Sequence, residues 1–175
     1  MSKNIITLAG PPCSGKTTAG KILSVSLRAD FIDIDQLIQH DSGHTIEWMF
    51  SHEGEKTFRA AEKRILAEVI FQTAGRTVIA LGGGALLDTN TRKLIERETI
   101  LFTLFALPET LAERNNGNRP LAGNSAMLKN LIRQREKHYL SLGRRINTEN
   151  RTPEDVAEAI RQEVLPLLSP QDRPC

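Results

Sequence analysis

Cysteines and long apolar runs are both scarce in this sequence, and each shortage excludes a class of protein. The longest apolar stretch, residues 100–107, has eight residues and already contains Thr103, whereas a membrane-spanning helix needs about 20. The two cysteines, Cys13 and Cys175, are too far apart in sequence to suggest a disulfide framework, which points to a reducing compartment. We therefore expect a cytoplasmic protein with no membrane partner and no secretory signal.

Aromatic residues and an excess of either charge are also lacking. Aromatic side chains make up 5% of the 175 residues, and 23 basic against 21 acidic residues leave a net charge of +2. Proteins that bind nucleic acids usually combine a concentrated basic face with aromatic side chains that stack on bases. This composition argues against a nucleic-acid partner and favours small anionic ligands.

What the sequence does contain is a regular alternation of short apolar runs and helical patterns. Strands are predicted over residues 4–9, 31–34, 77–81, 100–106 and 145–148. Helices are predicted over 16–27, from 36 to an interruption at 41–43, from 46, over 55–72 with an end at Gly75, from 108, over 126–142 and from 152. The alternation predicts a single α/β domain, a parallel sheet with helices on both faces. In such sheets ligands bind beyond the carboxyl ends of the strands.

The most specific motif lies between the first predicted strand and the first predicted helix. Residues 10–17, GPPCSGKT, fit the phosphate-loop pattern G-x-x-x-x-G-K-[ST]. Backbone N–H groups of such a loop face phosphate oxygens, its lysine reaches the β- and γ-phosphates, and its threonine offers a hydroxyl to Mg²⁺. The predicted nucleotide contacts are Gly10, Pro11, Pro12, Cys13, Ser14, Gly15, Lys16, Thr17 and Thr18.

Two further strand ends carry unusual residues. Asp33 and Asp35 have the i, i+2 spacing that would place both carboxylates on one face of a strand, about 6.6 Å apart. One could serve Mg²⁺ through water while the other holds a substrate hydroxyl; alternatively, Asp35 caps the helix that follows. The glycine triplet 82–84 after the third strand would allow a ligand to approach the backbone, or simply a sharp exit from the sheet.

Three arginines are candidates for binding charged groups. Arg119 lies in the polar segment 115–125 and could close over ATP to stabilise charge on the transferring phosphoryl group. Arg59 and Arg135 lie on predicted helices. Each of the three, taken alone, is also consistent with an ordinary solvated surface residue.

In their order along the chain, from about residue 5 to 168, these features resemble the shikimate kinase family. The most specific pieces are the phosphate loop, the strand end FIDID at 31–35 and the run FSHEGEKTFRAAE at 50–62. That run is similar to the family's F-x-x-x-G-E-x-x-F-R-x-x-E signature. The glycine triplet, the RPL sequence at 119–121, and Arg135 with Tyr139 four residues later follow in the family's order.

The resemblance implies transfer of phosphate from ATP to the 3-hydroxyl of shikimate, on a five-stranded parallel sheet of order 2-3-1-4-5 with a nucleoside-monophosphate-kinase-like fold. It implies a mobile lid at about 115–125 and a substrate-binding helical region at about 35–62. The implied catalytic residues are Lys16, Asp35 and Arg119. Mg²⁺ would be held by Thr17 and, through water, by Asp33. The implied nucleotide contacts outside the loop are Arg114, Arg119, Arg151 and Pro153. The implied substrate contacts are Asp35, Arg59, Glu62, Gly82, Gly83, Gly84 and Arg135.

Two other functions remain open from the sequence. A gluconate kinase would act on a sugar acid that also offers one carboxylate and several hydroxyls. A nucleotide-binding regulatory protein without catalysis would be consistent with Cys13, which stands where the family usually has glycine, and with the absence of the family's proline after Arg135. We expect a monomer.

Overall fold

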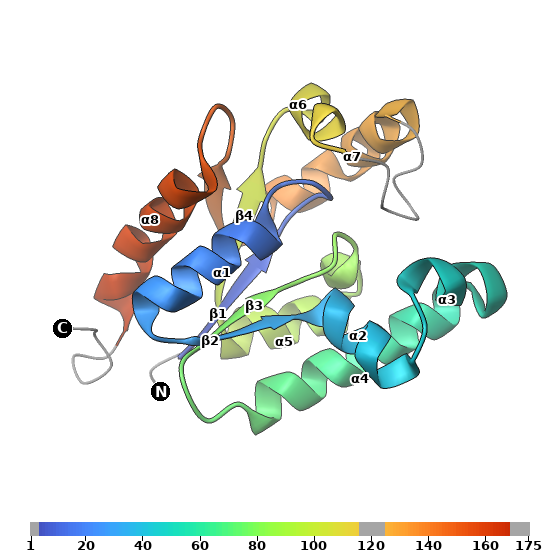
Figure 1. Cartoon of the computed structure of the whole chain (residues 1–175), viewed down its shortest axis with the longest axis horizontal. Helices are drawn as coiled ribbons and strands as arrows, with labels where there is room; N and C mark the ends of the chain where they lie inside the picture. The colour runs from blue at the N-terminus through green and yellow to red at the C-terminus, as the bar shows by residue number, and fades with distance from the viewer. Residues whose placement is uncertain (1–3, 116–124, 169–175) are drawn as a thin grey trace.

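A five-stranded parallel sheet lies between layers of helices in the computed structural model, which describes residues 4–115 and 125–168 (Figure 1). The strands are β1 Ile5–Ala9, β2 Asp30–Asp33, β3 Thr77–Ala80, β4 Ile100–Phe105 and β5 Arg144–Asn147. Their order in the sheet is β2-β3-β1-β4-β5, and every neighbouring pair is parallel. This confirms the predicted fold class and strand order.

Helices of very different lengths connect the strands. They are α1 Lys16–Leu27, α2 Ile34–Ser42, α3 Ile46–His52, α4 Gly54–Gln72, α5 Thr89–Glu98, α6 Pro108–Glu113, α7 Ser125–Leu140 and α8 Pro153–Val164, with short 3-10 turns η1 Ala85–Leu87 and η2 Leu165–Leu167. The start of α8 agrees with its predicted cap, because Thr152 and Asp155 form a reciprocal capping box.

Helix α5 was not predicted, because its sequence TNTRKLIERE offers only Leu94 and Ile95 as an apolar stripe. Its start is fixed instead by a cap: the Asp88 carboxylate accepts hydrogen bonds from the backbone N–H and the hydroxyl of Thr91, both at 2.8 Å. Ile95 is fully buried. A helix with a single buried apolar side chain and an N-terminal cap therefore forms here, although its hydrophobic periodicity is too weak to predict it.

The prediction that Asp33 and Asp35 share one face of a strand is wrong. Strand β2 ends at Asp33, whose side chain accepts the backbone N–H of Gln36 and so caps α2. Asp35 therefore lies in the first turn of a helix, and it is not the cap that the alternative expected.

The predictions for two helix ends in this part of the chain also need correction. Helix α2 continues through residues 41 and 42 and ends at Ser42, followed by the C-cap Gly43 with a left-handed φ of 71°. Helix α4 ends at Gln72, as predicted, but the residue that caps this end is Thr73 and not Gly75.

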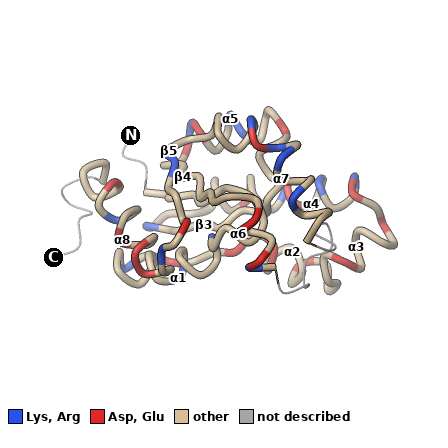
Figure 2. Tube along the Cα trace, turned by 90° about the horizontal axis from the view of Figure 1, so that it is seen from above, with Lys and Arg blue, Asp and Glu red and all other residues tan. Residues whose placement is uncertain are grey.

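The sheet separates the two largest of the three apolar clusters in the described core. Alternating residues of β1 point to opposite faces, so Ile6 and Leu8 pack with α1 and α8, while Ile5 and Ala9 pack with α2, α4 and α5. Figure 2 shows α5 on one side of the strands and α1 with α8 on the other. All five residues of β1 are buried, as expected for a strand covered on both faces.

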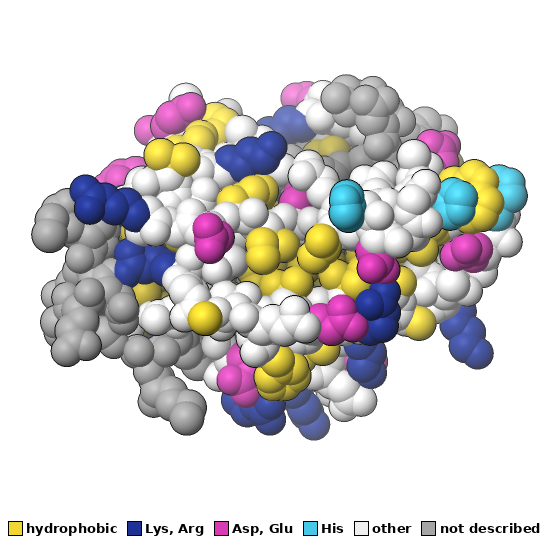
Figure 3. Space-filling model, turned by 60° about the horizontal axis from the view of Figure 1, so that its bottom comes forward, with side chains coloured by type: hydrophobic (Ala, Val, Ile, Leu, Met, Phe, Trp, Pro, Cys, Tyr) yellow, Lys and Arg dark blue, Asp and Glu magenta, His cyan; other side chains and the backbone are white. Residues whose placement is uncertain are grey.

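Charged side chains of both signs are interspersed over the face shown in Figure 3. Within residues 4–115 and 125–168, no helix combines the length and the apolar character that crossing a membrane requires.

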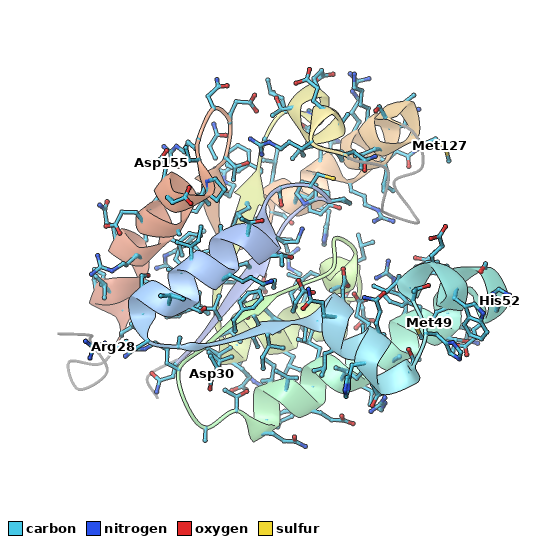
Figure 4. The ribbon with its side chains drawn as sticks, viewed as in Figure 1. Arg28, Asp30, Met49, His52, Met127 and Asp155 are labelled. Atoms are coloured by element: carbon cyan, nitrogen blue, oxygen red, sulfur yellow. The ribbon has the colours of Figure 1, made fainter. Side chains whose placement is uncertain are left out.

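The carboxyl ends of the strands lead into the segments that the sequence analysis singled out. The phosphate loop follows β1, the glycine triplet follows β3, and α2 follows β2 directly. Figure 4 shows Arg28, the C-cap of α1, and Asp30, the first residue of β2, on the opposite side of the molecule from Met127 of α7. The predicted lid lies almost wholly in residues 116–124, outside the described residues, and so does its Arg119.

Candidate active site

The phosphate loop depends on three residues with left-handed backbone conformations. Gly10, Cys13 and Gly15 have φ values of 132°, 63° and 90°. A Cβ atom on Gly10 would lie 2.1 Å from the backbone oxygen of Leu104, so only glycine fits there. Cys13 adopts the left-handed conformation that glycine reaches at no cost, and the loop keeps its turn with cysteine in this position.

Lys16, the first residue of α1, is held over the loop that precedes it. Its ammonium group donates hydrogen bonds to the backbone oxygens of Gly10 at 3.0 Å and Pro11 at 2.8 Å, and the residue is buried. Gly15 at the N-cap of α1 brings no side chain across the helix terminus. A positive ammonium group and the N-terminal end of a helix thus meet at one place, an arrangement that suits anionic phosphate groups.

Thr17 and Asp33 meet on the outer side of this loop. The Thr17 hydroxyl donates a 2.6 Å hydrogen bond to Oδ2 of Asp33, whose other oxygen caps α2. The two predicted metal ligands, 16 residues apart in sequence, are therefore in direct contact. Both offer oxygen atoms, the donor type that Mg²⁺ prefers.

A cavity of about 410 Å³ adjoins the phosphate loop, a volume typical of a small-ligand pocket. Its lining residues are Cys13, Ser14, Gly15, Lys16, Thr17, Thr18, Ala19, Arg114, Thr148, Arg151, Pro153 and Val156. The Arg114 guanidinium donates to the hydroxyl of Thr148 at 3.0 Å and to its backbone oxygen at 2.8 Å, which fixes the arginine at the rim. Arg114 and the pair Arg151 and Pro153, predicted from two separate segments, thus line a single cavity.

The glycine triplet is the point where the other predicted residues converge. A Cβ atom on Gly82 would lie 2.7 Å from an oxygen of Asp35 and 2.8 Å from an oxygen of Glu62. One on Gly83 would lie 2.9 Å from the Pro12 ring, and one on Gly84 would lie 2.4 Å from the Arg59 guanidinium. Any side chain at these positions would therefore displace a neighbour, and the triplet joins α2, α4 and the phosphate loop.

Arg59 is held by carboxylates on both sides along α4. It donates to Glu62 at 2.6 Å, one turn later, and to Glu55 at 3.2 and 3.3 Å, one turn earlier. Burial disfavours the charged guanidinium, but the attraction of Glu62 and Glu55 exceeds that penalty and raises the pKa of Arg59. The arginine therefore carries a fixed positive charge beside the triplet.

Glu62 is the most deeply buried acid of this cluster, with 3% of the residue exposed. Burial raises its pKa; Asp35 and Glu55 add to the rise, and Arg59 opposes it. One of its oxygens accepts from Arg59, while the other, buried next to Gly82, has no hydrogen-bond partner among the described residues.

Helix α7 reaches the same triplet through Tyr139. The buried phenol donates a 2.8 Å hydrogen bond to the backbone oxygen of Gly83. Burial raises the pKa of Tyr139, and the charge and hydrogen bond of Arg135 and the charge of Arg59 oppose that rise. Arg59 and Arg135, 76 positions apart in sequence, therefore both influence the ionisation of one phenol group.

Some residues of the site escaped the sequence analysis. Thr148 directly follows β5 and lines the cavity, so the rule that ligands lie beyond strand ends could have identified it. Glu55 was quoted in the signature without a role. Trp48 of α3 stacks between His44 and His52, with 3.7 and 4.5 Å between ring centroids, and Figure 4 shows His52 at the outer end of that helix.

Comparison with known proteins matches both the sequence and the fold. The family model described as shikimate kinase matches residues 12–165. A shikimate kinase of Rhodococcus erythropolis is 36% identical over 151 residues, covering 83% of this chain and 88% of that protein.

Solved structures give the same result at the level of three-dimensional structure. A shikimate kinase of Acinetobacter baumannii, solved in complex with shikimate, superposes with a TM-score of 0.85 at 32% identity, covering 93% of each chain. A gluconokinase of Sinorhizobium meliloti gives a TM-score of 0.56 at 16% identity, covering 95% of this chain and 92% of that one, a likeness of fold alone. The five-stranded kinase fold, the phosphate loop and the matches over most of the chain lead to one conclusion: this chain belongs to the shikimate kinase family.

Proposed function

We propose that this kinase transfers the γ-phosphoryl group of ATP to the 3-hydroxyl of shikimate in a site built on the glycine triplet. The observation that carries the proposal is the convergence at Gly82–Gly84 of a carboxylate from α2, an arginine with its paired glutamate from α4, and Pro12 of the phosphate loop. A small hydroxylated acid needs such a set: a cation for its carboxylate and an acceptor for its hydroxyl.

On the nucleotide side, the phosphate loop and Lys16 would bind the triphosphate. The ammonium group already sits over the loop on two backbone oxygens, and phosphate oxygens are stronger acceptors that would replace them. The adenosine part would occupy the cavity lined by Arg114, Arg151 and Pro153. Phosphoryl transfer then depends mainly on alignment and neutralisation of charge, with little covalent work by the protein.

On the substrate side, Arg59 and Arg135 would bind the carboxylate of shikimate and Asp35 would hold its hydroxyls. Asp35 lies in the first turn of α2 against Gly82, where its carboxylate can accept the proton of the attacking hydroxyl. Glu62 would keep Arg59 in place, because their 2.6 Å ion pair is almost entirely removed from solvent at the glutamate. The helical region 35–62 would thus form the substrate-binding part of the domain.

Thr17 and Asp33 fit a magnesium ion. Their hydroxyl and carboxylate oxygens already touch, and hard oxygen donors next to a phosphate loop are what this cation requires. The ion would neutralise charge on the phosphates, with Asp33 acting through water. In the same scheme Arg119, on the lid at about 115–125, would stabilise charge on the transferring group.

Two rival functions are separated by a direct assay. The purified protein is mixed with ATP and Mg²⁺. ADP release is then followed in three reactions: with shikimate, with gluconate and with no acceptor. We expect ADP release in the reaction with shikimate, and none with gluconate or without an acceptor. Turnover with gluconate alone would establish the gluconate kinase, and nucleotide binding without acceptor-dependent ADP release would establish a regulatory protein. Light scattering of the same sample tests the expected monomer.

A further inference from the structure

The turn made by Gly82–Gly84 is fixed from two sides. The backbone oxygens of Gly82 and Gly84 accept hydrogen bonds from Ala85 and Leu87 of the η1 turn, at 3.2 and 3.1 Å. The oxygen of the middle residue, Gly83, accepts instead from the hydroxyl of Tyr139 on α7, 56 residues away, at 2.8 Å. One phenol hydroxyl therefore connects this turn to the helix that carries Arg135.

The position of the turn controls the groups that touch it. The Arg59 guanidinium lies directly against Gly84, and the carboxylates of Asp35 and Glu62 lie against Gly82. A shift of a few tenths of an ångström in the turn changes these contacts, because the space for a Cβ atom is already filled at both positions. Tyr139 is thus placed to set the distance between the turn and α7.

We propose that Tyr139 is a positioning residue that aims Arg59 and Arg135 at one carboxylate by fixing the glycine turn to α7. The inference rests on the proposed function, since it assumes that the two arginines bind the carboxylate of shikimate. Arg135 lies one helical turn before Tyr139, on the same face of α7. The hydroxyl itself does not need to touch substrate.

The electrostatics of the phenol agree with this role. Both arginines lower the pKa of Tyr139 against the effect of burial. An arginine has only N–H donors and a backbone oxygen is only an acceptor, so the phenol accepts from Arg135 and donates to Gly83. A bound carboxylate would neutralise the arginines and raise the pKa of the phenol further, which makes Tyr139 sensitive to substrate.

The first test is Tyr139→Phe, which removes the hydroxyl and keeps the buried ring. We expect KM for shikimate to rise about tenfold, while KM for ATP stays within about twofold. Thr103→Val is the matched control, because it removes another buried hydroxyl that donates to a backbone oxygen, but to that of Leu142, at 3.1 Å, and not to a residue of the triplet. Its thermal midpoint should fall, with both KM values unchanged.

A second measurement reads Tyr139 directly. The chain has one tyrosine, so 3-fluorotyrosine incorporated during expression gives a single ¹⁹F resonance. Shikimate should shift this resonance, and ADP alone should not. An unshifted resonance at saturating shikimate, an unchanged shikimate KM in Tyr139→Phe, or an equal rise in Thr103→Val would each overturn the role of Tyr139. Wild-type protein that releases no ADP with shikimate would instead overturn the proposed function.

Discussion

The nucleotide side and the substrate side of this molecule are built in different ways. The phosphate loop is one continuous segment, positioned by its own backbone conformations and by Lys16, which folds back on it. The proposed substrate side is assembled from α2, α4, the turn after β3 and α7, which meet at the glycine triplet. A change in the loop should therefore affect every reaction of ATP, whereas a change in the assembled side should affect the acceptor alone.

Asp35→Asn is expected to have the largest effect on phosphoryl transfer, because it removes the carboxylate that we propose as the general base. An amide cannot accept the hydroxyl proton, and general-base catalysis typically contributes up to about 10,000-fold. We expect phosphoryl transfer to be abolished in the ADP-release assay, while calorimetry shows ATP bound as in the wild type. Turnover near the wild-type rate would remove Asp35 from the proposed role.

Lys16→Met tests the nucleotide side with a side chain of similar length and no charge. We expect kcat/KM for ATP to fall about 1,000-fold, since a positioned charge at the transferring group is lost. Shikimate binding, followed by the ¹⁹F signal of labelled Tyr139, should persist. If shikimate binding disappeared together with ATP binding, the two sides would not be separable.

Gly84→Ala tests the substrate side without replacing a charged residue. The added methyl group would lie 2.4 Å from the Arg59 guanidinium and must displace it, although φ at this position, −116°, suits alanine. We expect KM for shikimate to rise about 10- to 100-fold with little change in KM for ATP. Gly75→Ala is the control, because a Cβ atom there would meet nothing within 4 Å; an equal effect in both variants would contradict the prediction.

The smallest expected effect concerns the pH dependence of stability. Burial raises the pKa of Glu62 in the folded protein above its ordinary value of 4.5. Between the ordinary and the raised value the folded state holds more protons than the unfolded state, so this group makes the protein less stable as the pH rises. Glu62→Gln does not titrate.

The measurement is urea denaturation of both proteins between pH 4.5 and 7. The free energy of unfolding of the wild type, relative to Glu62→Gln, should fall across this range by on the order of 1 kcal/mol. A relative increase with pH would mean that the ion pair with Arg59 outweighs burial.

Sequence reasoning could predict the fold because its signals are local. Short apolar runs mark the strands, period-3.6 patterns mark helices, and the phosphate loop carries its own pattern between β1 and α1. The end of β2 was harder to predict, because the apolar pattern of Phe31 and Ile32 continues at Ile34, which already belongs to α2. Its end is decided by Asp33, which caps α2 and binds Thr17, a residue from another element.

The contacts of the substrate side could not be derived from spacing. No local pattern shows that Gly84 touches Arg59 or that Tyr139 reaches Gly83, because these pairs depend on how α4 and α7 pack against the sheet. The residues themselves were available from the family resemblance, but their distances were not. Arg114 illustrates the difference: its place in the cavity follows from hydrogen bonds to Thr148, 34 positions away.

The carboxylate of Asp33 has one more consequence. It ends β2, caps the helix that carries Asp35 and accepts the hydroxyl of Thr17, so this one carboxylate connects α1, next to the phosphate loop, with the helix that carries Asp35. Any free energy of coupling that passes through it must act equally in both directions. The factor by which nucleotide changes the dissociation constant of the acid is therefore the factor by which the acid changes that of the nucleotide.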